Sequence, residues 1–289
     1  MGAFYVLIAA ATACRVGDIY SFYFLCSIFI LPILWFEQNK RENLFLAYSF
    51  LVGVVAGFAH TIRSYSSLGL LVFIVIIALS VDFLDKKKKC LLLGLLVMGY
   101  MVCPIFVKHA LNYRNQQLEQ QGFVIKKDIG RHVLWHNMLA GFGFITNDKG
   151  LFYSDAVGGY ICKKYQVVYP SPEYEYRVKQ EVKKLIIHAP HYCLMALFSK
   201  FGVLLYFVLL FGNFGLLVAY FYRKPWYIEA AFFGALCANA IPGFIAVPVT
   251  MHMVGVISVA ALYGGYSLIC ACERGLYYDM RTKFLKILR

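Results

Sequence analysis

Apolar runs of membrane length recur along this chain, and short charged turns separate them. A helix needs roughly 20 apolar residues to cross a hydrocarbon core about 30 Å thick. With 61% hydrophobic and 15% charged residues, the chain is more apolar than a soluble protein of 289 residues needs to be. The sequence predicts an all-α polytopic membrane protein with about seven or eight transmembrane helices, in runs 19–36, 44–61, 68–81, 91–107, 201–222, 230–247 and 251–271.

The expected organisation has four parts. Transmembrane helices occupy residues 1–107, and the first of them is short or broken because run 4–14 cannot cross a bilayer alone. Residues 108–200 form a polar, α-rich insert that holds five of the seven histidines. Residues 201–272 return to the membrane, and residues 273–289 form a basic amphipathic tail.

Short loops rich in Lys and Arg resist translocation, so their positions predict the orientation. If each run crosses once, one side collects thirteen basic residues in loops and tail, against Arg15 and Arg63 in short loops on the other side. The basic side is expected to be cytoplasmic, and the insert 108–200 extracytoplasmic. We expect the protein to be a multi-pass component of a bacterial inner membrane.

The net charge of +13 would suggest nucleic acid in a soluble protein. Here the basic residues flank apolar runs, so anionic lipid headgroups are the expected partners and nucleic acid is not. Most of the nine cysteines lie in or beside apolar runs, where Cys behaves as a small hydrophobe, and no C-x-x-C occurs. No cofactor is expected, although a divalent metal is left open.

The predicted topology brings separate polar features to one membrane surface. These are Arg15 with Asp18, His60 with Arg63, the insert, and the turn 248–252. Ionisable groups cost about 3 kcal/mol each at the lipid centre, so a cluster at one interface indicates a functional site. As an alternative, Arg15 and Asp18 pair with each other at a helix end.

Within the insert, Ser171 followed by Pro172 is a helix-start signal, and Pro190 ends that helix. An apolar stripe is expected on its buried face, at Val178, Val182, Leu185 and Ile186. Pro242 and Pro248 interrupt the last hairpin, where neighbouring helices or water must bond the freed carbonyl groups.

The insert also holds candidate acceptor or loop contacts. His132 and His136 have i,i+4 spacing, but no third ligand is fixed, so a structural or substrate-contacting pair is favoured over a metal site. Asp148 and Asp155 lie in a Gly-rich loop, where bonds from their side chains to the backbone would form turns.

The order of motifs resembles a known class of enzymes. A span ends in AGFAHTIRSYSSLGLLVF, a later one leads into KHALNYRNQ, and WHNMLAGFGFITNDKGLFYSD precedes a charged helix and HAPHYCLMALFSKFGVLL. This order resembles bacterial GT-C membrane glycosyltransferases, relatives of the dolichyl-phosphate-mannose protein mannosyltransferases and of the lipid A aminoarabinose transferase. The chain is similar to the C-terminal two-thirds of such an enzyme and lacks the family's first outer loop with its acidic base.

The resemblance implies inverting transfer of a sugar from a polyprenyl-phosphate carrier to an extracytoplasmic glycan, lipid or protein acceptor. It makes Asp18 the candidate catalytic base, matching a second-loop acid of some members. Arg15, Arg63 and His60 would bind the donor phosphate through charge-assisted hydrogen bonds.

Three other functions stay open. An O-antigen-ligase-like enzyme also presents a large outer loop with Arg and His over a helical bundle. A carrier for a lipid-linked or anionic solute would need polar residues deep in its spans, and these runs contain few. An inactive or accessory membrane subunit would explain the missing first loop.

Overall fold

The protein is an all-α polytopic membrane protein, as its apolar runs predict. The computed structural model describes residues 21–63, 65–123, 134–222 and 224–273, and every regular element in these ranges is a helix. Five of these helices are long and apolar enough to cross a membrane. Two shorter apolar segments, Phe22–Gln38 and Leu68–Ser80, accompany them. Run 4–14 and the tail beyond residue 273 lie outside the described residues.

The described residues form two compact units. The first unit draws on Met1–Lys108, Tyr206–Ala240 and Met253–Arg289, and the second on His109–Leu205 and Ile241–His252. The second unit therefore contains the end of α11 (Trp226–Ile245) and the start of α12 (Thr250–Glu273), a segment that the sequence assigns to the last membrane hairpin.

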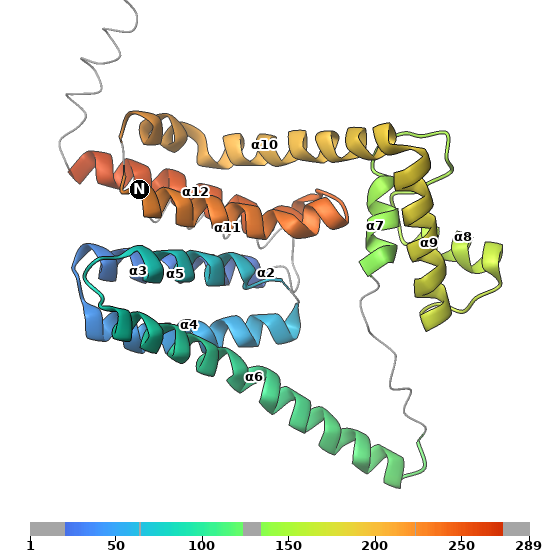
Figure 1. Cartoon of the computed structure of the whole chain (residues 1–289), viewed down its shortest axis with the longest axis horizontal. Helices are drawn as coiled ribbons and strands as arrows, with labels where there is room; N and C mark the ends of the chain where they lie inside the picture. Colours follow the sequence, from blue (N-terminus) through green and yellow to red (C-terminus); the bar gives the residue numbers. More distant parts are fainter. Residues whose placement is uncertain (1–20, 64, 124–133, 223, 274–289) are drawn as a thin grey trace, which may run out of the picture. The chain divides into compact units, whose positions relative to one another are not determined.

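Helices from both ends of the sequence build the first unit (Figure 1). Their bounds are α2 Ser21–Ile28, α3 Ile30–Gln38, α4 Glu42–Ile62, α5 Leu68–Ser80, α6 Lys86–Gln120, α10 Pro190–Phe221, α11 Trp226–Ile245 and α12 Thr250–Glu273. The last residues of α6 and α11, and the first of α10 and α12, belong to the second unit. α6 contains run 91–107 and continues beyond it to Gln120.

The core of the first unit is apolar and aromatic. The Phe73 ring of α5 meets the Phe232 ring of α11 edge to face, with centroids 5.0 Å apart. Phe232 in turn lies 5.0 Å from the Tyr263 ring of α12. Such offset ring pairs add to the free energy gained by burying their area. They tie α5 to α11 and α12, although α5 is far from these two helices in the sequence.

Glycines let α4 and α6 approach at backbone distance. A Cβ atom on Gly57 would lie 2.2 Å from the carbonyl oxygen of Tyr100, and one on Gly99 would lie 2.2 Å from that of Phe50. Lipid tails are as apolar as Leu, so packing of small residues is a main source of helix association in membranes. Gly215 of α10 and Gly264 of α12 make a second contact of this kind.

We expect Gly99→Ala to lower the unfolding free energy of the detergent-solubilised protein by about 2 kcal/mol, because the added methyl group overpacks the contact. Gly94→Ala in the same helix is the matched control, since a Cβ there meets nothing within 4 Å. The measurement is thermal unfolding of both variants. Equal melting temperatures would show that α4 and α6 do not pack in this way.

Three short helices, α7 Leu134–Phe142, α8 Ala156–Tyr165 and α9 Pro172–His188, form the body of the second unit (Figure 1). The start of α9 is confirmed, because the Ser171 hydroxyl accepts a hydrogen bond from the Tyr174 N–H at 3.1 Å. Val178 and Val182 are buried as predicted. The prediction is wrong for Ile186, which is 44% exposed. The core also contains Leu139, Val157, Ile161 and Ala196.

Lys200 satisfies the carbonyl groups at the end of α11. Its side chain is buried, and its amine donates to the carbonyl oxygens of Phe244 at 2.8 Å and Ala246 at 2.7 Å. A cation is favourable at a helix C-terminus, where carbonyl groups lack partners within the helix. The sequence predicts that carbonyl groups near Pro242 and Pro248 need hydrogen-bond donors from neighbouring helices or water. For the carbonyl groups of Phe244 and Ala246, Lys200 of α10 is that donor.

We expect Lys200→Met to destabilise the protein by about 2 kcal/mol, because it removes the donor to two carbonyl groups at the end of α11. Lys183→Met is the control, since Lys183 is exposed on α9. Thermal unfolding and the rate of proteolysis between α11 and α12 report the change. A Lys200→Met protein as stable and as protease-resistant as the control would contradict this role.

Candidate functional site

A buried histidine lies at the centre of the second unit. α7 places His136 between α8 and α9, and only 4% of its surface is exposed. Its Nδ1 lies 2.6 Å from the Tyr174 hydroxyl, and its Nε2 lies 3.2 Å from Oδ1 of Asp155. In the tautomer with the proton on Nε2, the ring donates to the carboxylate and accepts from the tyrosine. Both ring nitrogens are thus engaged by neighbours from other elements.

The packing around His136 fixes the ring. The Tyr169 ring lies 5.6 Å from that of His136 and 5.0 Å from that of Tyr174, in an edge-to-face arrangement with the latter. At Gly158 on α8, an added Cβ would lie 3.2 Å from both His136 Cε1 and the Tyr174 hydroxyl. Because Gly158 has no side chain, there is space for the side chains of His136 and Tyr174 to meet.

Asp155 differs from its partners because its side chain is fully exposed. It occupies the residue before α8 but makes no capping hydrogen bond to that helix. One carboxylate oxygen is oriented by the buried imidazole, and the rest of the group faces solvent. The arrangement can accept hydrogen bonds from a ligand or take a proton from a hydroxyl group.

A second carboxylate lies beside this centre. Oε1 of Glu175 accepts a long hydrogen bond of 3.5 Å from the Trp135 N–H, and buried Oε2 has no hydrogen-bond partner among the described residues. Burial raises the pKa of Glu175, and this outweighs the opposing effects of the Trp135 N–H, His136 and Lys179. Burial likewise raises the pKa of Tyr174, so its hydroxyl stays protonated as a donor.

The raised pKa of Glu175 makes stability depend on pH. In the unfolded chain the carboxyl ionises near its ordinary value of 4.5, and in the folded protein only at higher pH. The folded state therefore loses stability as pH rises through this interval, and the loss persists at neutral pH. We expect Glu175→Gln to raise the melting temperature at about pH 7 and to bring no gain at about pH 3, where both side chains are neutral.

Glu173→Gln is the matched control for this substitution, because Glu173 is exposed and pairs with Arg177 one turn away at 2.7 Å. Its effect should be small at both pH values. A gain for Glu175→Gln that is the same at both pH values would contradict a burial effect on the carboxyl.

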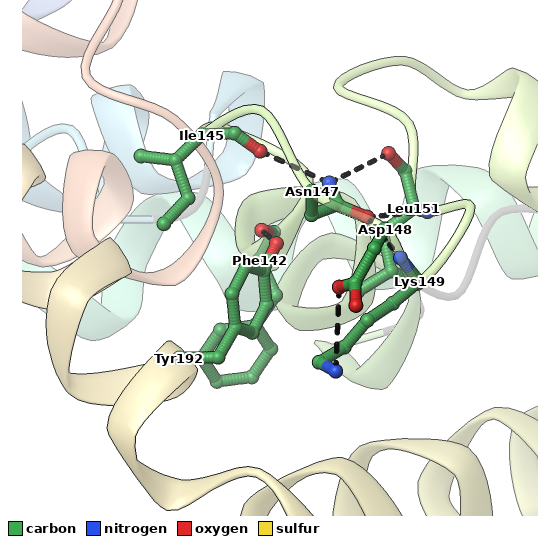
Figure 2. Close-up of polar contacts among 7 residues, drawn as sticks. All are labelled: Phe142, Ile145, Asn147, Asp148, Lys149, Leu151 and Tyr192. Atoms are coloured by element: carbon green, nitrogen blue, oxygen red, sulfur yellow. Dashed lines mark hydrogen bonds and ion pairs between the residues drawn. The ribbon is translucent and has the colours of Figure 1, made fainter.

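Asn147 organises the loop between α7 and α8 (Figure 2). Its amide donates to the carbonyl oxygens of Ile145 at 3.0 Å and Leu151 at 3.2 Å, and its side-chain oxygen accepts from the N–H groups of Lys149 and Leu151, both at 3.1 Å. Asn147 therefore makes the turn-forming hydrogen bonds that were expected of Asp148. Asp148 is exposed and pairs with Lys149 at 3.5 Å.

The candidate donor-phosphate residues that the structure describes belong to the first unit. His60 lies in the last turn of α4, with its ring 5.7 Å from that of Tyr100 on α6. Arg63 ends the same helix in an extended conformation, is partly exposed, and donates its backbone N–H to the Ala59 carbonyl oxygen at 2.9 Å. The two side chains thus come from one end of α4.

Other predicted site residues are not part of the structure described. Arg15, Asp18 and His132 lie outside the described residues, so their roles and the His132–His136 pair stay predictions. Within the described ranges, no group of three or more His, Cys, Asp or Glu side chains gathers as metal ligands.

Sequence reasoning missed Tyr174, Tyr169 and Glu175. A signal for Tyr174 was present, because it precedes Val178 and Val182 at the same four-residue spacing and therefore faces the same core. No spacing rule connects Tyr169 or Glu175 to His136, since they lie on other elements.

Comparisons of the chain with protein-family models, with curated proteins and with solved structures found no match. Function has to be inferred from the chemistry of the residues themselves.

Proposed function

We propose that this protein is a GT-C-like membrane glycosyltransferase of a bacterial inner membrane. It would move a sugar from a polyprenyl-phosphate carrier to an acceptor on the extracytoplasmic side. The observation that carries the proposal is the exposed Asp155 carboxylate, which buried His136 holds within the polar second unit. An ordered acceptor of hydrogen bonds suits the hydroxyl groups that take part in sugar transfer.

Basic residues near the end of α4 support the donor side of this proposal. The leaving group is a lipid-linked phosphate, an anion that stays at the membrane interface. Arg63 offers a planar guanidinium group that bonds two phosphate oxygens at once, and His60 lies one turn earlier in the same helix. Arg15 is expected to add a second cation from the short loop before run 19–36.

In the proposed reaction the acceptor hydroxyl attacks the anomeric carbon from the face opposite the phosphate. The new glycosidic C–O bond forms as the bond to the phosphate oxygen breaks, with inversion. The hydroxyl proton passes to the Asp18 carboxylate, and the carrier leaves as polyprenyl phosphate, whose charge Arg63 and Arg15 stabilise. Metal chemistry is not needed to balance these steps.

Buried polar groups in the described spans favour an enzyme over a carrier. The hydroxyls of Ser27, Ser258 and Ser267 donate to carbonyl oxygens one turn earlier in their own helices. The Asn239 amide donates to the Gly255 carbonyl oxygen at 3.2 Å. Such groups serve local or helix-to-helix bonding rather than a continuous polar path for a solute.

The test is transfer in proteoliposomes supplied with polyprenyl-phosphate-linked mannose, glucose or aminoarabinose, with methyl glycosides and lipopolysaccharide as acceptors. Release of polyprenyl phosphate is the readout. We expect Arg63→Ala to lower the rate by about 100-fold, because it removes charge stabilisation of the leaving group. Asp18→Asn should be at least as damaging because it removes the base.

Arg114→Ala is the matched control, since Arg114 is exposed on the polar extension of α6 and bonds to the Asn115 side chain. It should retain the wild-type rate. Equal activity of Arg63→Ala, Asp18→Asn and Arg114→Ala would remove the site assignment, and wild-type protein inactive with every donor would remove the proposed activity.

A further inference from the structure

We propose that Asp155 and Tyr169 form a binding subsite for a pyranose ring of the acceptor. This inference rests on the proposed function and narrows it, because it makes the acceptor a glycan. His136 and Tyr174 act as positioning residues behind the subsite.

The carboxylate of Asp155 defines the polar half of the subsite. It is fully exposed, yet its Oδ1 is held 3.2 Å from a ring nitrogen of a histidine that is itself 4% exposed. An ionised carboxylate only accepts hydrogen bonds, so its ligand must present donors. Adjacent hydroxyl groups of a sugar ring supply two donors at the spacing of one carboxylate.

Tyr169 defines the apolar half. About half of its surface is exposed, while its ring is fixed against the rings of His136 and Tyr174. An exposed aromatic ring that is already immobilised loses little entropy when a ligand packs on it. The C–H groups on one face of a pyranose pack on such a ring, and its hydroxyls remain free for the carboxylate.

The exposed carboxylate at this place disfavours an anionic acceptor. Asp155 and Glu175 are both acidic, and Lys179, the basic side chain packed on the neighbouring Trp135 ring at 5.4 Å, is only partly exposed. An anionic lipid headgroup would meet the exposed Asp155 carboxylate, which is unfavourable. A neutral sugar brings hydrogen-bond donors without charge.

The positioning role follows from the contacts behind Asp155. The Asp155 carboxylate only accepts hydrogen bonds, so the Nε2 that faces it carries the proton, and Nδ1 accepts from the Tyr174 hydroxyl at 2.6 Å. Asp155 is thereby held in one orientation before any ligand arrives. Gly158 keeps the space open that this contact requires.

The experiment measures saturation-transfer NMR on the full chain in nanodiscs. The probes are methyl α- and β-glycosides of glucose, galactose, mannose and N-acetylglucosamine. We expect binding of at least one glycoside, weakened about tenfold or more by Asp155→Asn and by Tyr169→Ala. Matched controls are Glu173→Gln and Tyr176→Ala, an exposed carboxylate and an exposed ring on α9. Both should bind as the wild type does.

Histidine-labelled protein gives a readout that loss of folding would not imitate. The ¹⁵N signal of Nε2 in His136, identified by its absence in His136→Gln, should shift in Asp155→Asn and not in Glu173→Gln. Melting temperatures of all variants confirm that they are folded. An unshifted signal in Asp155→Asn would overturn the positioning role.

The outcomes separate the subsite from the proposed function. Glycoside binding that depends on Asp155 and Tyr169, without transfer from any donor, supports the subsite and removes the transferase. Transfer with an unchanged acceptor KM in both variants keeps the transferase and overturns the subsite. Wild-type protein that binds no glycoside, or equal weakening in variants and controls, also overturns it.

Discussion

Backbone groups inside a membrane have no water to bond, and this constraint governs the whole structure. Helices satisfy it along their length, so the apolar runs are helical. Helix ends need partners from outside, and at the end of α11 the buried Lys200 amine provides them. Because helix surfaces and lipid are equally apolar, helix pairs gain by close approach, which Gly57 and Gly99 permit between α4 and α6.

The second unit differs from the first, because it buries an apolar core and also carries many polar groups. It does so around His136, whose two ring nitrogens contact Tyr174 and Asp155. A satisfied buried network of this kind fixes one arrangement of the helices that carry it. The same network leaves one member, Asp155, open to solvent. The same contacts thus hold the helices in place and present the Asp155 carboxylate to a ligand.

Local chemistry was predictable wherever one short segment decided it. Ser171 and Pro172 predicted the start of α9, because the capping hydrogen bond forms within four residues. The loop before α8 was predictable as a turn but not in its detail. Asn147 both donates and accepts, whereas the neighbouring carboxylate of Asp148 only accepts, so the amide holds the loop. The residue type made Asp155 a candidate contact, but the sequence did not predict that His136 is its partner.

By itself, the sequence determined that this is a helical membrane protein with a polar insert, because hydropathy and helix signals are properties of continuous segments. The tertiary structure decided which side chains meet. His136 and Tyr174 are 38 residues apart, and Lys200 bonds carbonyl groups 44 and 46 residues away. Such pairs depend on how elements pack in three dimensions, and spacing along one helix or strand carries no information about a partner on another.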